Sequence, residues 1–87
     1  KIICDRFGSK CSEALLIAKC ESGFVPTKVN TNDSKRTGYN SYGLFQINGP
    51  SNWAWNNPIA NTEAAYQKYL RRGWQPWINC RNSNKLV

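Results

Sequence analysis

The sequence predicts one small α+β domain, mainly α-helical, with a short β-hairpin and stapling disulfides. Three observations lead to this prediction. The chain has 87 residues, the size of a single domain. Two segments carry helical patterns of apolar residues, and an alternating, β-prone segment lies between them. Four cysteines, an even number in so short a chain, are typical of secreted domains whose thin core is reinforced by disulfides.

The first predicted helix spans residues 12–22. One of its faces carries four residues at helical spacing: Ala14, Leu15, Ala18 and Glu21. Gly23 is the residue type that commonly ends a helix in a left-handed conformation. Pro26 prevents the helix from resuming, so a helix boundary is expected at residue 23.

The middle of the chain is predicted to contain turns and strands. Residues 30–41 are polar and rich in Asn, Ser, Thr and Lys, which predicts a loop or hairpin. Residues 42–48 alternate in polarity and are β-prone, and Gly49-Pro50 ends this segment.

A second helix is predicted over residues 62–72, with Asn61 as its N-cap and Gly73 at its end. Pro76 suits a first helical position, so a short helical turn is expected there. Residues 81–87 are predicted to form a loose C-terminal tail.

The composition excludes several classes of function. The chain has no His, which removes Ser–His and Cys–His nucleophiles and histidine metal sites. It has no C-x-x-C pair and no glycine-rich phosphate loop, so we expect neither a metal nor a cofactor. No apolar run reaches the roughly 18 residues of a membrane span. The start of the chain lacks an apolar leader, as expected of a mature or trimmed product.

The net charge of +7 favours polyanionic partners such as nucleic acid, anionic lipid or an acidic cell wall. Charge alone does not choose among them. No recognised nucleic-acid-binding motif is present, so no nucleic acid is expected. Four Trp and four Tyr would suit flat ligands such as sugar rings where they are exposed, although most are expected in the core.

The remaining candidates for acid–base chemistry are the five carboxylates. Glu21 stands out because it lies on the apolar face of its helix, in the last turn. The helix dipole and partial burial both disfavour the charged form there, which would raise the pKa and suit a general acid. The alternative interpretation is a solvated Glu at a frayed helix end.

Two motifs at a specific spacing resemble the lysozyme superfamily. Cys-Glu-Ser-Gly-Phe-Val-Pro at residues 20–26 resembles lytic transglycosylases and resuscitation-promoting factors. Tyr-Gly-Leu-Phe-Gln-Ile-Asn at residues 42–48 resembles animal C-type lysozymes. Gly-Trp-Gln-Pro-Trp-Ile-Asn-Cys at residues 73–80 resembles the end of resuscitation-promoting factors. The resemblance covers residues 12–80 and implies a lysozyme-like domain, which we assign to residues 1–80.

The resemblance also implies roles for individual residues. Glu21 matches the catalytic acid of these families. Several other residues match the substrate-binding cleft: Gln46 and Asn48 on its floor, Tyr42 and Gly43 in the turn that forms it, and Trp74 packed near the acid. Trp53 or Trp55 would stack on sugars or lie in the core, whereas Trp77 and Tyr69 are assigned to the core. Ser22 would bond either Glu21 or only the backbone.

One departure from C-type lysozymes concerns the second carboxylate. It would immediately precede the Tyr-Gly pair, but Ser41 stands at that position. Asp33, eight residues earlier, is the nearest acidic candidate. A lytic transglycosylase mechanism, in which the substrate supplies the nucleophile, therefore fits best. The alternative is hydrolysis, with Asp33 or a water held by Ser41 completing the site.

The four cysteines, Cys4, Cys11, Cys20 and Cys80, allow three pairings. Cys11 and Cys20 would be roughly 13 Å apart along a helix, beyond disulfide reach. Two pairings remain open: Cys4–Cys11 with Cys20–Cys80, and Cys4–Cys20 with Cys11–Cys80. We choose the first, which would pin the end of the first helix to the Trp-rich terminus, as in resuscitation-promoting factors.

The combined expectation is a secreted or cell-envelope, bacteriolytic enzyme, acting as a monomer on peptidoglycan glycan strands. It would cleave the β-1,4 bond between N-acetylmuramic acid and N-acetylglucosamine, with Glu21 as general acid and base. The alternatives are a hydrolytic muramidase and a catalytically inactive, basic wall- or membrane-binding protein.

Overall fold

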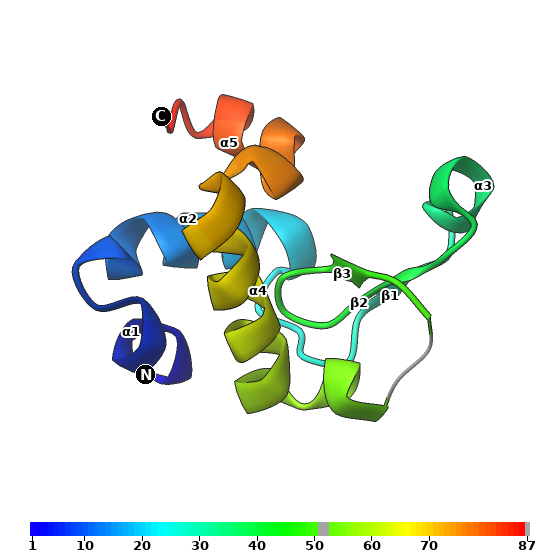
Figure 1. Cartoon of the computed structure of the whole chain (residues 1–87), viewed down its shortest axis with the longest axis horizontal. Coiled ribbons are helices and arrows are strands. Elements are labelled where there is room, and N and C mark those ends of the chain that lie inside the picture. Colours follow the sequence, from blue (N-terminus) through cyan, green and yellow to red (C-terminus); the bar gives the residue numbers. More distant parts are fainter. Residues whose placement is uncertain (51–52, 87) are drawn as a thin grey trace.

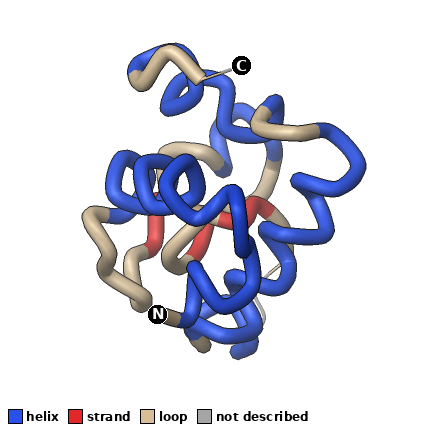
Figure 2. Tube along the Cα trace, turned by 90° about the vertical axis from the view of Figure 1, so that its left-hand side faces the viewer, coloured by secondary structure: helices blue, strands red, loops and turns tan. Residues whose placement is uncertain are grey.

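The computed structural model describes residues 1–50 and 53–86. Its α-helices are α1 (Ile2–Phe7), α2 (Cys11–Ser22), α3 (Ser34–Thr37), α4 (Pro58–Arg72) and α5 (Ile78–Ser83). Its strands are β1 (Val29–Asn30), β2 (Ser41–Tyr42) and β3 (Ile47–Asn48), and single 3-10 turns cover Gly8–Lys10, Trp53–Asn56 and Gln75–Trp77. The predicted mainly helical α+β class is confirmed. Figure 2 shows the strands as short segments among much longer helices.

The strands form an antiparallel sheet in the order β1-β2-β3, rather than the two-stranded hairpin that was predicted. Ser41 pairs with Asn48 and Tyr42 with Ile47, while Val29 pairs with Tyr42. The segment 30–41, predicted as a loop or hairpin, is the hairpin that joins β1 to β2. It turns through α3, which lies at the outer end of the sheet in Figure 1, away from α2 and α4.

Helix α2 ends as predicted. Gly23 has φ 62° in the left-handed region, and its N–H donates to the carbonyl of Lys19. A side chain would be strained in this conformation, so glycine is the residue that closes the helix most easily. The helix begins at Cys11, one residue before the predicted start. Glu21 therefore lies in the last turn, as expected.

Helix α4 begins four residues earlier than predicted, and Asn61 is not its N-cap. Pro58 occupies the first turn, and the side chain of Asn57 accepts hydrogen bonds from the N–H groups of Ile59 and Ala60. Asn57 as N-cap and Pro58 in the first turn therefore set the start of α4. The prediction of Asn61 as N-cap was wrong. Asn is a residue type that suits a cap, but Asn61 lies inside α4 and bonds to other segments of the chain.

Asn61 is fully buried and joins three segments. Its Oδ1 accepts the N–H of Phe45 at 2.8 Å, and its Nδ2 donates to the carbonyls of Tyr42 and Trp55, each at 2.8 Å. Gly43 lies so close that an added Cβ would meet the Asn61 amide and the Trp55 carbonyl. Gly43, with φ 79°, is therefore required where the turn between β2 and β3 crosses α4.

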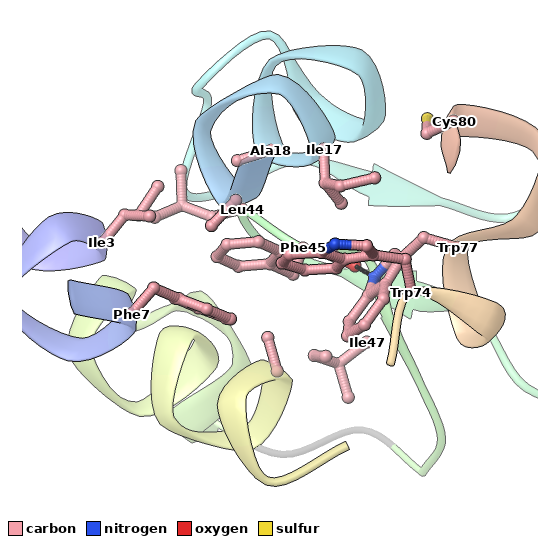
Figure 3. Close-up of a cluster of buried hydrophobic side chains, with 12 residues drawn as sticks. Ile3, Phe7, Ile17, Ala18, Leu44, Phe45, Ile47, Trp74, Trp77 and Cys80 are labelled. Carbon is pink, nitrogen blue, oxygen red and sulfur yellow. Dashed lines mark hydrogen bonds between the residues drawn. The ribbon is translucent and has the colours of Figure 1, made fainter. Parts of the chain in front are cut away.

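The core combines aliphatic side chains from α1, α2 and the sheet with aromatic side chains from both ends of the chain (Figure 3). Phe7 packs against the rings of Phe45, Tyr66, Tyr69 and Trp74. Helix α1, which buries Ile3 and Phe7, was not predicted because six residues give too short a pattern to recognise. Tyr69 and Trp77 belong to the core or its margin, as predicted.

The disulfides are Cys4–Cys11 and Cys20–Cys80, which confirms the chosen pairing. The second bridge links the end of α2 to α5 across 60 residues. The predicted loose tail is wrong in part. Residues 81–83 continue α5, and Leu86 packs against the core. Within the described ranges, every helix is too short or too polar to serve as a membrane span.

We predict that Asn61→Ala lowers the free energy of unfolding by about 3 kcal/mol, because one buried and two partly buried backbone groups lose their partner. Asn57→Ala, which removes only a helix cap, should cost about 1 kcal/mol. Urea unfolding with the disulfides intact measures both. Equal losses in the two variants would show that Asn61 does not have this role.

Candidate functional site

A cleft of about 600 Å³ lies between the sheet side of the molecule and the segment around α5. Glu21 reaches it from the end of α2. The sheet side contributes Asn30, Ser41, Gln46, Asn48, Asp33, Arg36 and Thr37. The opposite wall consists of Pro76, Trp77, Ile78, Asn79 and Cys80. The fold thus brings together Glu21, Ser41, Gln46 and Asn48, four of the residues predicted from the sequence, and adds Asp33.

The carboxyl group of Glu21 has a pKa raised to about 7. The main cause is burial, which disfavours the charged form, and the negative charge of Asp33 adds to it. The positive charge of Lys28 acts in the opposite direction, and the Lys28 Nζ donates to the backbone carbonyl of Glu21 at 3.1 Å. Near neutral pH, Glu21 is therefore present in both protonated and ionised forms.

Asp33 lies beside Ser41, the residue that stands where a second carboxylate was looked for in the sequence. The hydroxyl of Ser41 donates to Asp33 Oδ2 at 2.5 Å, and Arg36 Nη2 lies 3.4 Å from Asp33 Oδ1. Asn48 Nδ2 donates to Ser41 Oγ at 3.2 Å, across the register pair of β2 and β3. The chain turns through α3 and brings Asp33 back to Ser41, eight residues later. The Asp33 carboxylate therefore lies at the Ser41 side of the cleft.

Gln46 lines the cleft and holds a buried oxygen without a partner in the described part of the chain. Its Nε2 donates to the carbonyls of Gly43 at 2.8 Å and Lys28 at 3.2 Å, which fixes the orientation of the amide. Its buried Oε1 has no partner among the described residues. Gln46 also has φ 49°, in the left-handed region that side-chain-bearing residues seldom adopt.

Trp74, which the resemblance places near the acid, does not line the cleft around Glu21. Trp74 is 2% exposed, and its indole N–H donates to Glu13 Oε1 at 2.7 Å. Glu13 lies two turns before Glu21 on α2, so Trp74 covers the other end of that helix. Trp77 instead lines the cleft, while its indole N–H donates to the Phe45 carbonyl at 2.8 Å. Trp77 therefore packs in the core and also lines the cleft.

The other predicted residues lie outside the cleft lining. Ser22 donates to the carbonyl of Ala18, which is the backbone alternative, and Tyr42 is half-buried in β2. Trp55 packs against the core and donates to the Pro50 carbonyl. Gly43 shapes the adjacent turn. The side chain of Trp53 lies outside the part of the chain that the structure describes.

Asn30, Arg36, Thr37 and the α5 wall line the cleft but were not predicted from the sequence. Arg36 and Thr37 belong to a polar segment with no motif. The wall could have been found from the Cys20–Cys80 pairing, since that bridge places Cys80 beside the residue preceding Glu21. Among residues 1–50 and 53–86, no cluster of three Cys, Asp or Glu side chains could hold a metal ion.

Comparison with known proteins found no matching family model, no matching curated protein and no matching solved structure. The chemistry of the cleft is therefore what bears on function. That chemistry is one carboxyl group with a pKa near neutrality, a second carboxylate held by Ser41, and the polar side chains that line the same cleft.

We predict that Glu21→Gln gains stability relative to the wild type as pH rises from 4.5 to 8. In that window the folded wild type holds a proton at Glu21 that the unfolded chain has released, so its stability falls with rising pH. The relative gain should be about 2 kcal/mol, reduced for the partial exposure of the carboxyl group. Urea unfolding at both pH values measures it, and a difference independent of pH would contradict the raised pKa.

Proposed function

We propose that this protein cleaves the β-1,4 bond between N-acetylmuramic acid and N-acetylglucosamine in peptidoglycan, with Glu21 as general acid and base. The observation that carries the proposal is a carboxyl group with a pKa of about 7 in an open polar cleft. A general acid is most effective when its pKa lies near the working pH. Glu21 therefore suits proton donation to a glycosidic oxygen.

The catalytic sequence follows from the two forms of Glu21. The protonated carboxyl group donates to the leaving oxygen, and the bond from that oxygen to the sugar C1 breaks. Positive charge develops on the sugar ring, and the Asp33 carboxylate on the sheet side of the cleft supplies a compensating negative charge. Glu21, now ionised, can accept a proton from the hydroxyl group that attacks C1. It is then ready for another cycle.

The substrate follows from the cleft floor together with the sequence motifs. Ser41, Gln46 and Asn48 line the cleft and give it polar groups that suit the acetamido and hydroxyl groups of a sugar. Residues 20–26 and 42–48, which resemble the lysozyme superfamily, supply Glu21 and Gln46 to the same cleft. Two disulfides and the charge of +7 fit a secreted monomer that works on an anionic wall.

The position of Asp33 changes the balance between the two possible routes. The preference for transglycosylation rested on Ser41 in place of a carboxylate, but Asp33 lies against Ser41 in the cleft. Two carboxyl groups in one cleft favour hydrolysis, in which water attacks C1. Transglycosylation, in which the muramyl C6 hydroxyl attacks, remains the second candidate. It is favoured by the contacts of both Asp33 oxygens, to Ser41 and Arg36, which hinder direct attack by Asp33.

We predict that Glu21→Gln lowers the rate of peptidoglycan clearing by at least about 1,000-fold, since Gln is nearly isosteric but has no acidic proton. Glu13→Gln is the matched control. Glu13 lies on the same helix outside the cleft, and Gln can still accept the hydrogen bond from Trp74. Turbidity of a suspension of purified cell walls measures both rates.

Two results would contradict the assignment of Glu21. One is clearing by Glu21→Gln within tenfold of the wild type. The other is an equal loss in Glu13→Gln, which would indicate damage to α2 rather than removal of an acid. If Glu21→Gln lyses intact cells as fast as the wild type, that result would favour the non-catalytic, basic wall- or membrane-binding alternative.

A further inference from the structure

Arg36 is the cationic side chain of the cleft among the lining residues that the structure describes. It lies on α3, which is at the outer end of the sheet (Figure 1), and it lines the cleft beside Asp33 and Thr37. Its side chain is 73% exposed, so the guanidinium group lies at the open rim. Lys35, the preceding residue, is exposed but does not line the cleft.

The contact between Arg36 and Asp33 is weak enough to be exchanged for a ligand. Arg36 Nη2 lies 3.4 Å from Asp33 Oδ1, on a short exposed helix. Exposed ion pairs of this kind contribute little to stability. Asp33 does not depend on the contact, because its Oδ2 accepts the hydroxyl of Ser41 at 2.5 Å. Arg36 can therefore turn to an anion in the cleft while Asp33 stays in position.

A planar guanidinium group recognises carboxylates through two parallel N–H donors. The two sugars of peptidoglycan differ in this respect. N-acetylmuramic acid carries a lactyl ether whose carboxyl group is free or extended by a peptide with its own carboxylates, whereas N-acetylglucosamine carries none. A cation at the cleft rim would thus distinguish peptidoglycan from chitin, whose backbone has the same β-1,4 linkage and acetamido groups but no carboxylate.

We propose that Arg36 binds a carboxylate of the N-acetylmuramic acid side arm and makes the cleft selective for peptidoglycan over chitin. The inference rests on the proposed function. Arg36 is a specificity-determining residue that does not take part in bond cleavage. When it engages the substrate, Asp33 Oδ1 loses its contact with Arg36 and faces the sugar ring. Binding of the substrate carboxylate by Arg36 therefore also frees Asp33 Oδ1.

Two ligands with equal numbers of rings separate the carboxylate from the sugar backbone. One is the tetrasaccharide of alternating N-acetylglucosamine and N-acetylmuramic acid with free lactyl carboxylates, and the other is chitotetraose. Titration by calorimetry in a Glu21→Gln background keeps both ligands intact. Arg36→Gln should weaken binding of the first ligand about tenfold, the range expected for a charge-assisted pair at an exposed site. It should change chitotetraose binding less than twofold.

Lys35→Gln is the matched control, because it removes the same charge one residue away and outside the cleft. It should change the affinity for either ligand less than twofold. Equal weakening by Arg36→Gln and Lys35→Gln would overturn the inference in favour of general electrostatic attraction. Unchanged binding of both ligands in Arg36→Gln would overturn it while the proposed function stands. Failure of the Glu21→Gln protein to bind either ligand would overturn both.

Discussion

The hydrogen bonds of the buried Asn61 amide are the constraint on which the sheet side of the cleft depends. They attach the turn between β2 and β3 to α4 through the backbone of Tyr42 and Phe45. With that turn fixed, Gln46 follows in a left-handed conformation with its Oε1 free, and Ser41 and Asn48 face each other across the strands. A buried polar group with all partners in place specifies one arrangement, because any other would leave backbone groups unpaired.

The opposite side of the cleft depends on a covalent constraint. The Cys20–Cys80 bridge holds α5 against the end of α2, so the wall containing Trp77 lies next to Glu21. Burial raises the Glu21 pKa, and the negative charge of Asp33 raises it further. The acid thus depends on a contact that is distant in sequence, whereas Asp33 and Arg36 are held by contacts within eight residues of Asp33.

Features set by short-range interactions were predictable. The end of α2 at Gly23 and the position of Glu21 follow from residues within one helical turn. The cysteine spacing excluded one of three pairings. Long-range features were not predictable: Asn61 suits an N-cap in sequence yet bonds across the fold, and Trp74 meets Glu13 rather than Glu21. Asp33 belongs to no motif, and only the fold of the α3 turn brings it to Ser41.

Mass spectrometry of the fragments released from purified peptidoglycan tests the central claim most directly. The wild type should release fragments that end in N-acetylmuramic acid, with a reducing end if Asp33 assists attack by water. Asp33→Asn should then lose most of these hydrolytic products. Wild-type fragments that are lighter by one water, with an anhydro end, would show transglycosylation and retain the role of Glu21. Intact glycan strands, or fragments ending in reducing N-acetylglucosamine, would contradict the account.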